Sequence, residues 1–328
     1  MEAIVHMTLL SLLVCTAIAI VRIKDLFAVV MLAGIYGLLS ASFFVMMDAV
    51  DVAFTEASVG AGISTLLMLT TLTMTGRYES GSRFRPLLAL SIVAFTGALL
   101  IYGTADLPSF GDPDAPIHQH VAPRYLNDSA HEIHIPNVVT SVLASYRGFD
   151  TFGEAVVIFT AGIGVLALLQ LFVASKAINT ADAMKEHMVL RIVAKMLIPL
   201  ILLFGLYVQF HGDYGPGGGF QAGVIFAAAF FLYSMLFGLD TAMRIINHSV
   251  VQMIAACGVL LYGSVGVVSM LNGKNFLDYS ALAEDAASGQ HIGIILVELG
   301  VGLTVASVMM LIFFAFSRHS SAWQEKKQ

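Results

Sequence analysis

The chain has 328 residues, of which 58% are hydrophobic and only 12% are charged. Because soluble domains carry about 25% charged residues, this composition excludes a soluble globular protein and predicts an all-α integral membrane protein. Its formal net charge of −6 says little about partners, since charge is partitioned across a membrane. We expect the lipid bilayer as its surroundings and no nucleic acid as a partner.

A membrane-spanning helix needs about 20 apolar residues to cross a hydrocarbon core of about 30 Å. The segments that meet this requirement number about nine: 3–21, 27–47, 51–75, 86–104, 151–175, 189–210, 218–238, 246–271 and 290–317. The first segment lacks a basic region and a cleavage site, so we interpret it as a retained helix and not as a signal peptide. Cys15 and Cys257 lie inside apolar segments, which argues against a disulfide framework.

The distribution of basic residues predicts the orientation, because cytoplasmic loops are enriched in Lys and Arg. With the N-terminus outside, the outer face holds only Arg124, Arg147 and Lys274, and the other 13 of the 16 basic residues face inward. Nine spans then place the C-terminus in the cytoplasm. We therefore expect a multi-pass protein of the bacterial inner (plasma) membrane.

The outer segment 105–149 has a non-membrane composition. Its first part, "DLPSFGDPDAPIHQHVAP", should be irregular because it is rich in Pro and Asp. The later "PNVVTSVLASYRGFD" has apolar residues at helical spacing and predicts an amphipathic helix on the outer interface or on neighbouring helices. The segment also holds His118, His120, His131 and His134. No thiolate or dedicated carboxylate accompanies them, so we interpret them as solvated residues and predict no metal site.

Ionisable residues inside spans are candidates for function, since each costs about 2.5–3.5 kcal/mol on insertion scales. Glu298 should lie near the membrane midplane, and Glu56 and Glu154 one to two turns inside the outer face. The full set of candidates for an ion pathway is Asp48, Asp51, Glu56, Asp150, Glu154, Lys195 and Glu298. Structural alternatives remain open: Lys195 can reach the inner headgroups, the aspartates can flank helix starts, and neutral glutamates can form interhelical hydrogen bonds.

Residues 211–223, "HGDYGPGGGFQAG", lie between two apolar segments. Pro216 is tolerated at a helix start, and Gly217 and Gly218 allow a tight reversal. Gly219, Gly223 and Ala227 then recur at four-residue spacing, which predicts a close helix–helix contact. A further interpretation is that free N–H groups at this helix start hold a carboxylate or anion, with His211 and Asp213 as polar partners.

Three stretches together resemble known transporter subunits. "LYVQFHGDYGPGGGFQAGVIFA" and "HIGIILVELGVGLTVASVMMLIF" resemble the B-type subunit of the Mrp-type multisubunit Na+/H+ antiporters. "DAVDVAFTEASVGAGISTLLML" resembles the three-helix domain near the end of the antiporter's large A-type subunit, and "NVVTSVLASYRGFDTFGEAVVIFTAGIGVLALL" resembles the domain after it. In membrane-bound hydrogenases the first of these domains is a separate chain. The resemblance implies three domains: 1–80 with three helices, 81–180 with two helices and the outer loop, and 181–328 with four helices.

The resemblance also extends to individual residues of the family's motifs. Asp51 and Glu56 match the acidic pair of the first domain, Arg147, Asp150 and Glu154 match "RGFDTxGE", and Gly217, Gly218, Gly219 and Phe220 match "PGGGF". The family often has a His where Asp213 stands, which leaves the roles of His211, Asp213 and Tyr214 open. The first domain is similar to the J-type subunit of respiratory complex I, whose third helix can bear a π-bulge. Gly60 and Gly62 would permit one here.

These observations predict a non-catalytic membrane subunit of a multisubunit cation/proton antiporter that contributes to an ion pathway. No catalytic residue and no cofactor are expected, and Na+ and H+ would be the transported ions. The implied partners are the other membrane subunits, including a large antiporter-like subunit that this chain does not supply. Alternatives are a subunit of an ion-pumping hydrogenase or complex I-like complex, and a structural scaffold. Lack of a clear inverted repeat argues against an independent transporter.

Overall fold

The computed structural model describes residues 2–80, 86–109, 111–170 and 188–325. These residues are helical with no strand, apart from an isolated β-bridge between Asp25 and Tyr78. The described helices include nine that are long and apolar enough to cross a membrane, which confirms the predicted spans. Residues 171–175 of the fifth predicted span lie outside the described part, as do basic residues used for the orientation: Arg83, Arg85, Lys176, Lys185, Lys326 and Lys327.

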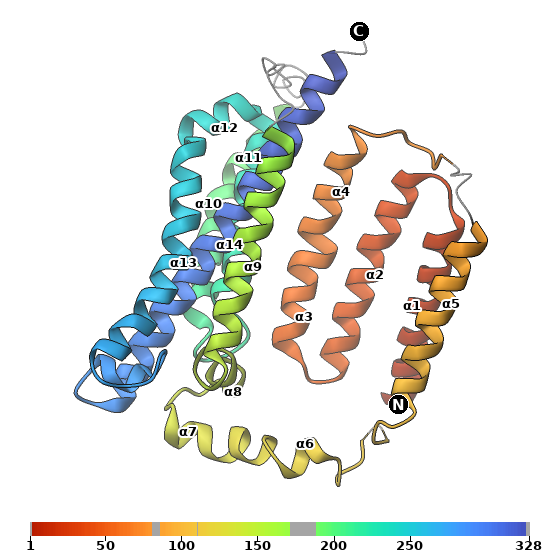
Figure 1. Cartoon of the computed structure of the whole chain (residues 1–328). Helices are drawn as coiled ribbons and strands as arrows, with labels where there is room; N and C mark the ends of the chain where they lie inside the picture. The colour runs from red at the N-terminus through yellow and green to blue at the C-terminus, as the bar shows by residue number, and fades with distance from the viewer. Residues whose placement is uncertain (1, 81–85, 110, 171–187, 326–328) are drawn as a thin grey trace.

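The spans are close to their predicted bounds. They are α1 (Glu2–Arg22), α2 (Leu26–Met46), the continuous α3–η1–α4 (Val50–Leu72), α5 (Pro86–Thr104), α9 (Gly148–Gln170), α10 (Met188–His211), α11 (Gly219–Phe237), α13 (His248–Leu271) and α14 (Ala286–Glu325). In Figure 1 the N-terminus lies at the same end as the segment between α5 and α9, and the C-terminus at the opposite end. We call the first of these the loop end.

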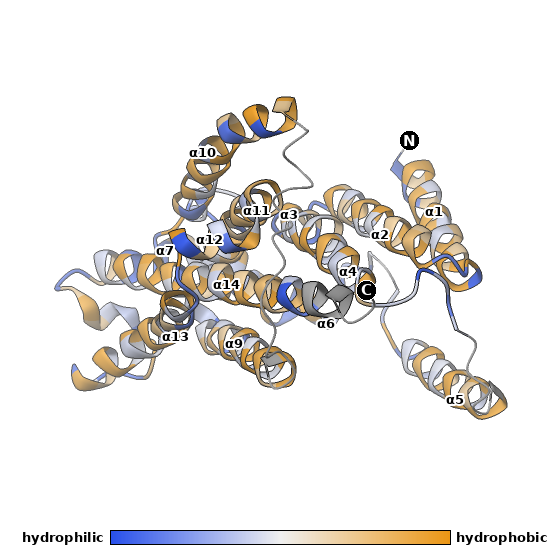
Figure 2. Cartoon of the chain, turned by 90° about the horizontal axis from the view of Figure 1, so that it is seen from above, coloured by the Kyte–Doolittle hydropathy of each residue, from blue (hydrophilic) through white to orange (hydrophobic). Residues whose placement is uncertain are grey.

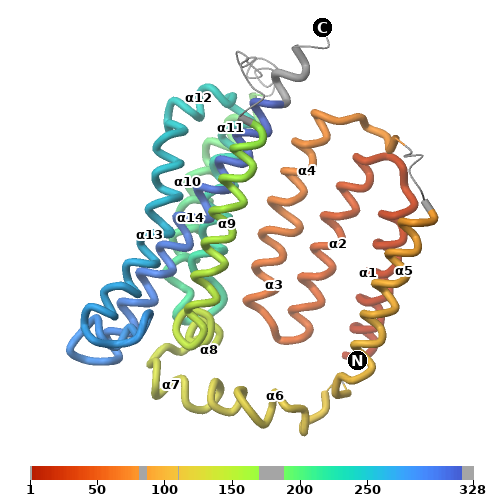
Figure 3. Tube along the Cα trace, in the orientation of Figure 1, coloured from red at the N-terminus to blue at the C-terminus, as the bar shows by residue number. Residues whose placement is uncertain are grey.

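Most of the spans belong to one of two groups of helices. Helices α9, α10, α11 and α13 surround or flank α14, and α1 to α4 form a second group beside them (Figure 1). Helix α11 contacts α3 and η1, and α14 contacts α4, which joins the groups. Seen from above, α5 stands apart from both groups with apolar residues around its circumference (Figure 2). The chain between α5 and α9 crosses the loop end as a strap (Figure 3).

Small residues let the central helices approach closely, as the sequence predicts. Gly219, Gly223 and Ala227 are all buried on α11. A Cβ on Gly223 would lie 2.8 Å from the carbonyl oxygen of Gly302 on α14. On the opposite side of α14, a Cβ on Gly258 of α13 would lie 2.7 Å from the Gly300 carbonyl oxygen. Backbones packed this closely exclude larger side chains, which is the usual basis of helix association in membranes.

The third span contains the predicted π-type distortion. Element η1 (Ala57–Ser64) is an eight-residue π-helix that connects α3 (Val50–Glu56) to α4 (Thr65–Leu72). A Cβ on Gly37 of α2 would lie 2.9 Å from the Ala61 backbone nitrogen, so α2 packs directly against this segment. The wider turn rotates the residues on α3 relative to those on α4.

The strap contains more helix than the sequence predicts. The short helix α6 (Pro116–Gln119) interrupts the stretch expected to be irregular, and η2 (Arg124–Asp128) and α7 (Ser129–Glu132) follow it. Proline is favourable in a first helical turn, and here Pro116 begins α6 and Pro123 precedes η2. The predicted amphipathic helix is present as α8 (Val138–Thr140) and η3 (Ser141–Tyr146).

Candidate ion pathway

The glycine-rich segment forms a turn whose backbone conformation favours glycine. Gly218 has a φ of 106°, a region that L-residues with side chains rarely adopt. Its N–H donates to the carbonyl of Val208 at 3.0 Å, which folds the chain back onto the last turns of α10. A Cβ on Gly217 would lie 2.7 Å from that same oxygen. The turn therefore fixes where α11 begins.

Helix α8 holds this turn from the side. Asn137 donates from Nδ2 to the carbonyls of Gly212 and Gly215, both at 3.0 Å. The hydroxyl of Thr140 donates to the Gly212 carbonyl at 2.6 Å. The polar residues Asn137, Thr140 and Ser141 are buried. The apolar Val139 and Leu143 stay exposed. The buried face of the amphipathic helix is thus its polar one, because it satisfies the carbonyls of the glycine turn.

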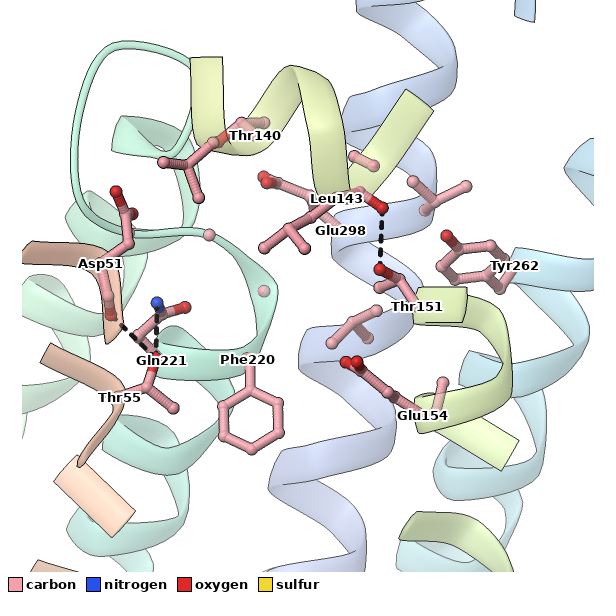
Figure 4. Close-up of a pocket in the computed structure, with 18 of the residues that line it drawn as sticks. Asp51, Thr55, Thr140, Leu143, Thr151, Glu154, Phe220, Gln221, Tyr262 and Glu298 are labelled. Atoms are coloured by element: carbon pink, nitrogen blue, oxygen red, sulfur yellow. Dashed lines mark hydrogen bonds between the residues drawn. The ribbon is translucent and has the colours of Figure 1, made fainter. Parts of the chain in front are cut away.

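A cavity of about 380 Å³ lies beneath this turn, between α3, α8, η3, α9, α11, α13 and α14. Figure 4 shows Asp51 and Thr55 entering from α3, Glu154 and Thr151 from α9, and Glu298 from α14 between them. The remaining polar side chains in its wall are Thr140, Gln221 and Tyr262. Three of the predicted carboxylates, from three different spans, therefore share one cavity.

Glu298 is a partly buried residue of α14 whose side chain lies beside the start of α11. Its Oε1 would be 2.9 Å from a Cβ on Gly218 and 3.1 Å from one on Gly212. Helix N-termini carry partial positive charge and favour carboxylates, and the carboxyl group of Glu298 is placed beside this helix start. Because α14 begins at Ala286, Glu298 is about 18 Å along the helix.

The other two carboxylates differ in environment. Glu154 is exposed and sits in the second turn of α9. Asp51 is partly buried in the first turn of α3. One turn further on, Thr55 accepts a 3.0 Å hydrogen bond from Nε2 of Gln221, which connects α3 to α11 across the cavity. Sequence reasoning missed Thr55 and Gln221, although both are polar residues inside spans.

Several predicted pathway residues lie elsewhere. Glu56 does not line the cavity; it packs where a Cβ on Gly60 would be 2.5 Å, and one on Gly37 3.3 Å, from its Oε1. Lys195 is in the first half of α10, with its ammonium 5.6 Å from the ring centre of Phe237, the last residue of α11. Asp48 is exposed in the turn before α3, with a φ of 57°.

Asp150 is in the first turn of α9, exposed, and pairs with Arg147 at 2.6 Å. His118, His120, His131 and His134 are all exposed. Among the described residues, no cluster of three or more His, Cys, Asp or Glu side chains could hold a metal.

The glycine turn also positions His211, Asp213 and Phe220. His211 stacks on Tyr207 with ring centres 4.9 Å apart, and Phe220 lines the cavity. Asp213 is buried, with 6% of its surface exposed, and its Oδ2 lies 3.0 Å from Nδ1 of His291. Burial raises the pKa of Asp213, and His291 opposes that rise. Sequence reasoning missed His291, which lies seven residues before Glu298 and so on the same side of α14.

Comparison with known proteins matches the chain in three consecutive parts. Residues 189–311 match the domain related to the MnhB subunit of Na+/H+ antiporters. Residues 11–77 match the MbhD family and residues 102–187 the MbhE family, both described as subunits of MBH. The antiporter subunit mnhB2 of Staphylococcus haemolyticus is 36% identical over 138 residues, which are 41% of this chain and 97% of the relative. The corresponding protein of Staphylococcus aureus strain Newman is 34% identical over the same shares.

Solved structures share the fold. The Mrp complex from Dietzia sp. DQ12-45-1b contains a chain with a TM-score of 0.74 and 25% identity, over 94% of this chain. The match spans 34% of that longer chain. A chain of the archaeal membrane-bound sulfane sulfur reductase has a TM-score of 0.56 and 29% identity, over 70% of this chain and 97% of its own length.

Fold, composition and comparisons define a multi-span membrane subunit of a multisubunit transport complex. More particularly, the chain belongs to the MnhB family of Mrp/Mnh Na+/H+ antiporter subunits, with domains related to the MbhD and MbhE subunits of membrane-bound hydrogenases in front of it.

Proposed function

We propose that the chain is a non-catalytic subunit of an assembled Na+/H+ antiporter and that the cavity under the glycine turn is part of its ion pathway. One observation carries the proposal: the acidic side chains of Asp51, Glu154 and Glu298 come from three separate spans and line a single cavity. Carboxylates at membrane depth are costly unless water, a cation or a proton accompanies them. A cavity of about 380 Å³ offers room for such an occupant.

Glu298 is the central step in this proposal because it lies between the other two carboxylates and lines the cavity. Glu154 and Asp51 supply flanking sites on either side. The transported species would be Na+ and H+, without a bound cofactor. The large antiporter-like subunit implied by the resemblance would complete the pathway.

The test is Na+/H+ exchange by the complete complex in everted membrane vesicles. Changing Glu298→Gln should lower exchange by about tenfold or more, in line with the loss of one proton-transfer group. Glu154→Gln should lower it less, because Glu154 is solvent-exposed. Glu284→Gln, an exposed loop residue, is the matched control. Unchanged exchange with Glu298→Gln in a fully assembled complex would refute the proposal.

Glu56→Gln belongs in the same series. Glu56 faces Gly37 and Gly60, not the cavity, so we expect a smaller effect than at Glu298. An effect equal to that of Glu298→Gln would place a second route between α2 and η1.

A second candidate is a subunit of a redox-driven ion pump. The matches to the MbhD and MbhE families and to the sulfane sulfur reductase chain favour it. The antiporter is preferred because the Mrp chain matches 94% of this protein and the reductase chain 70%. Purification of the native complex with an inventory of its subunits separates the two, since iron–sulfur or hydrogenase subunits would identify the redox-driven pump.

A further inference from the structure

The two carboxyl oxygens of Asp213 have different surroundings. Its Oδ2 pairs with Nδ1 of His291, whose side chain is 41% exposed. Its Oδ1 is buried and has no hydrogen-bond partner among the described residues. A buried carboxylate oxygen without a partner costs about 1–3 kcal/mol or more. The pair therefore has one side open to the surroundings and another that faces inward with unused hydrogen-bonding capacity.

A second, smaller cavity of about 80 Å³ adjoins Asp213. It is lined by Gln209, Phe210, Asp213, Ile295, Glu298 and Leu299. At about 30 Å³ for each water in the liquid, two or so water molecules fit. Glu298 lines this cavity and the main one. A short water chain from Asp213 would thus end at the residue that the proposed pathway depends on.

The charged groups around Asp213 come from three elements. His291 and Glu298 face it from α14, Asp51 contributes from α3 through its interaction with Glu298, and His211 lies two residues before it on α10. Two of these neighbours are acids. Burial already favours protonation of Asp213 by raising its pKa, and ionised acids nearby act in the same sense.

We propose that His291 and Asp213 form a proton branch that exchanges protons between the loop end and Glu298 through the small cavity. The inference rests on the proposed function. The imidazole accepts a proton at Nε2 from outside and donates the one at Nδ1 to Oδ2 of Asp213. Rotation of the neutral carboxyl then turns the protonated oxygen toward the cavity, where it gives that same proton to water, and the water protonates the Glu298 carboxylate. Each step moves one proton, and the reverse order serves the opposite direction.

Chemical rescue tests the branch in the assembled complex. His291→Gly should lower exchange several-fold, most strongly at alkaline pH, where protons are scarce. Because His291 is partly exposed, added imidazole should restore a measurable part of the rate. His131→Gly, at an exposed strap position, should show neither effect. Recovery with imidazole supports the branch, and a loss that imidazole does not restore overturns it.

A second variant keeps the test decisive if the glycine variant fails to assemble. His291→Gln preserves size and hydrogen bonding but carries no titratable proton, so the pH profile of exchange should lose its alkaline limb. An unchanged profile overturns the branch. Failure of the proposed function looks different: Glu298→Gln would then be silent as well. Loss with Glu298→Gln beside an unchanged profile for His291→Gln refutes only the branch.

Discussion

The hydroxyl of Tyr262 on α13 donates a 2.7 Å hydrogen bond to the carbonyl of Gly148, the first residue of α9. Both groups are buried, and Tyr279 makes a parallel 2.8 Å bond to the carbonyl of Ala144. These bonds fix the start of α9 and therefore the position of Glu154, six residues on. Two tyrosines outside the acidic set thus determine where one of its members lies.

Tyr262→Phe should remove the side-chain donor to the Gly148 carbonyl, which costs about 0.5–1.5 kcal/mol. We expect a lower Tm for the purified protein in detergent and reduced exchange by the complex. Tyr214→Phe is the control, because Tyr214 is 67% exposed. A Tm for Tyr262→Phe equal to that of the control would contradict this role.

Gly219→Ala should prevent normal packing of α11 on α14. The added Cβ would overlap the backbone carbonyl of Glu298, and backbone cannot move aside as a flexible side chain can. We expect loss of the assembled complex, measured by co-purification with a tagged partner subunit. Gly97→Ala on α5 is the matched control, since its Cβ would have nothing within 4 Å.

Asn137→Ala removes the two Nδ2 hydrogen bonds to the Gly212 and Gly215 carbonyls, of which Gly212 keeps the bond from Thr140. The expected loss is about 1–3 kcal/mol, with faster proteolysis at the turn between α10 and α11. Ser145→Ala offers a comparison, because Ser145 bonds Gln290 and not the turn. Equal protection of the turn in the two variants would show that α8 does not hold it.

The buried carboxyl of Asp213 should make stability depend on pH. Its pKa in the folded protein is raised, so the folded state binds the proton more tightly than the unfolded state does. The associated stability is fully present below the unfolded value near 4 and is lost as pH rises through the folded pKa. Asp213→Asn should therefore raise Tm relative to the original protein more at pH 7 than at pH 4. A constant difference would show that burial does not shift this group.

Gly60→Ala and Gly62→Ala form a matched pair in the π-helix. A Cβ at Gly60 would lie 2.5 Å from Oε1 of Glu56, whereas one at Gly62 would be 3.6 Å from the nearest heavy atom. Only Gly60→Ala should displace Glu56, and we expect a Tm lower by several degrees than that of Gly62→Ala, in line with a cost of about 1–3 kcal/mol. Identical values would mean that Glu56 adjusts freely.

Much of this architecture could be predicted because each span is a long run of apolar residues. The close contacts between α11, α13 and α14 occur at glycines, which the sequence also shows. The π-helix after Glu56 followed from a resemblance supported by Gly60 and Gly62. The site was only partly predictable. The positions of Glu154 and Glu298 inside predicted spans marked them as candidates. Position along a span does not show toward which neighbouring helix a side chain points, and Glu56 faces α2 instead of the cavity. The partner of Asp213 was missed because His291 is 78 residues away in sequence and only tertiary packing brings the pair together.

The contact between Asn137 and the glycine turn has a consequence for how such complexes are made. The mnhB2 relatives are almost completely matched by 41% of this chain, so a polypeptide of that length has no room for the strap and α8 as well. There the same tether would have to form between separately translated chains and would depend on their concentrations. Fusion makes it an encounter within one molecule, with an effective concentration in the millimolar range. It also fixes the ratio of the two parts at one to one, whatever the expression levels of neighbouring subunits.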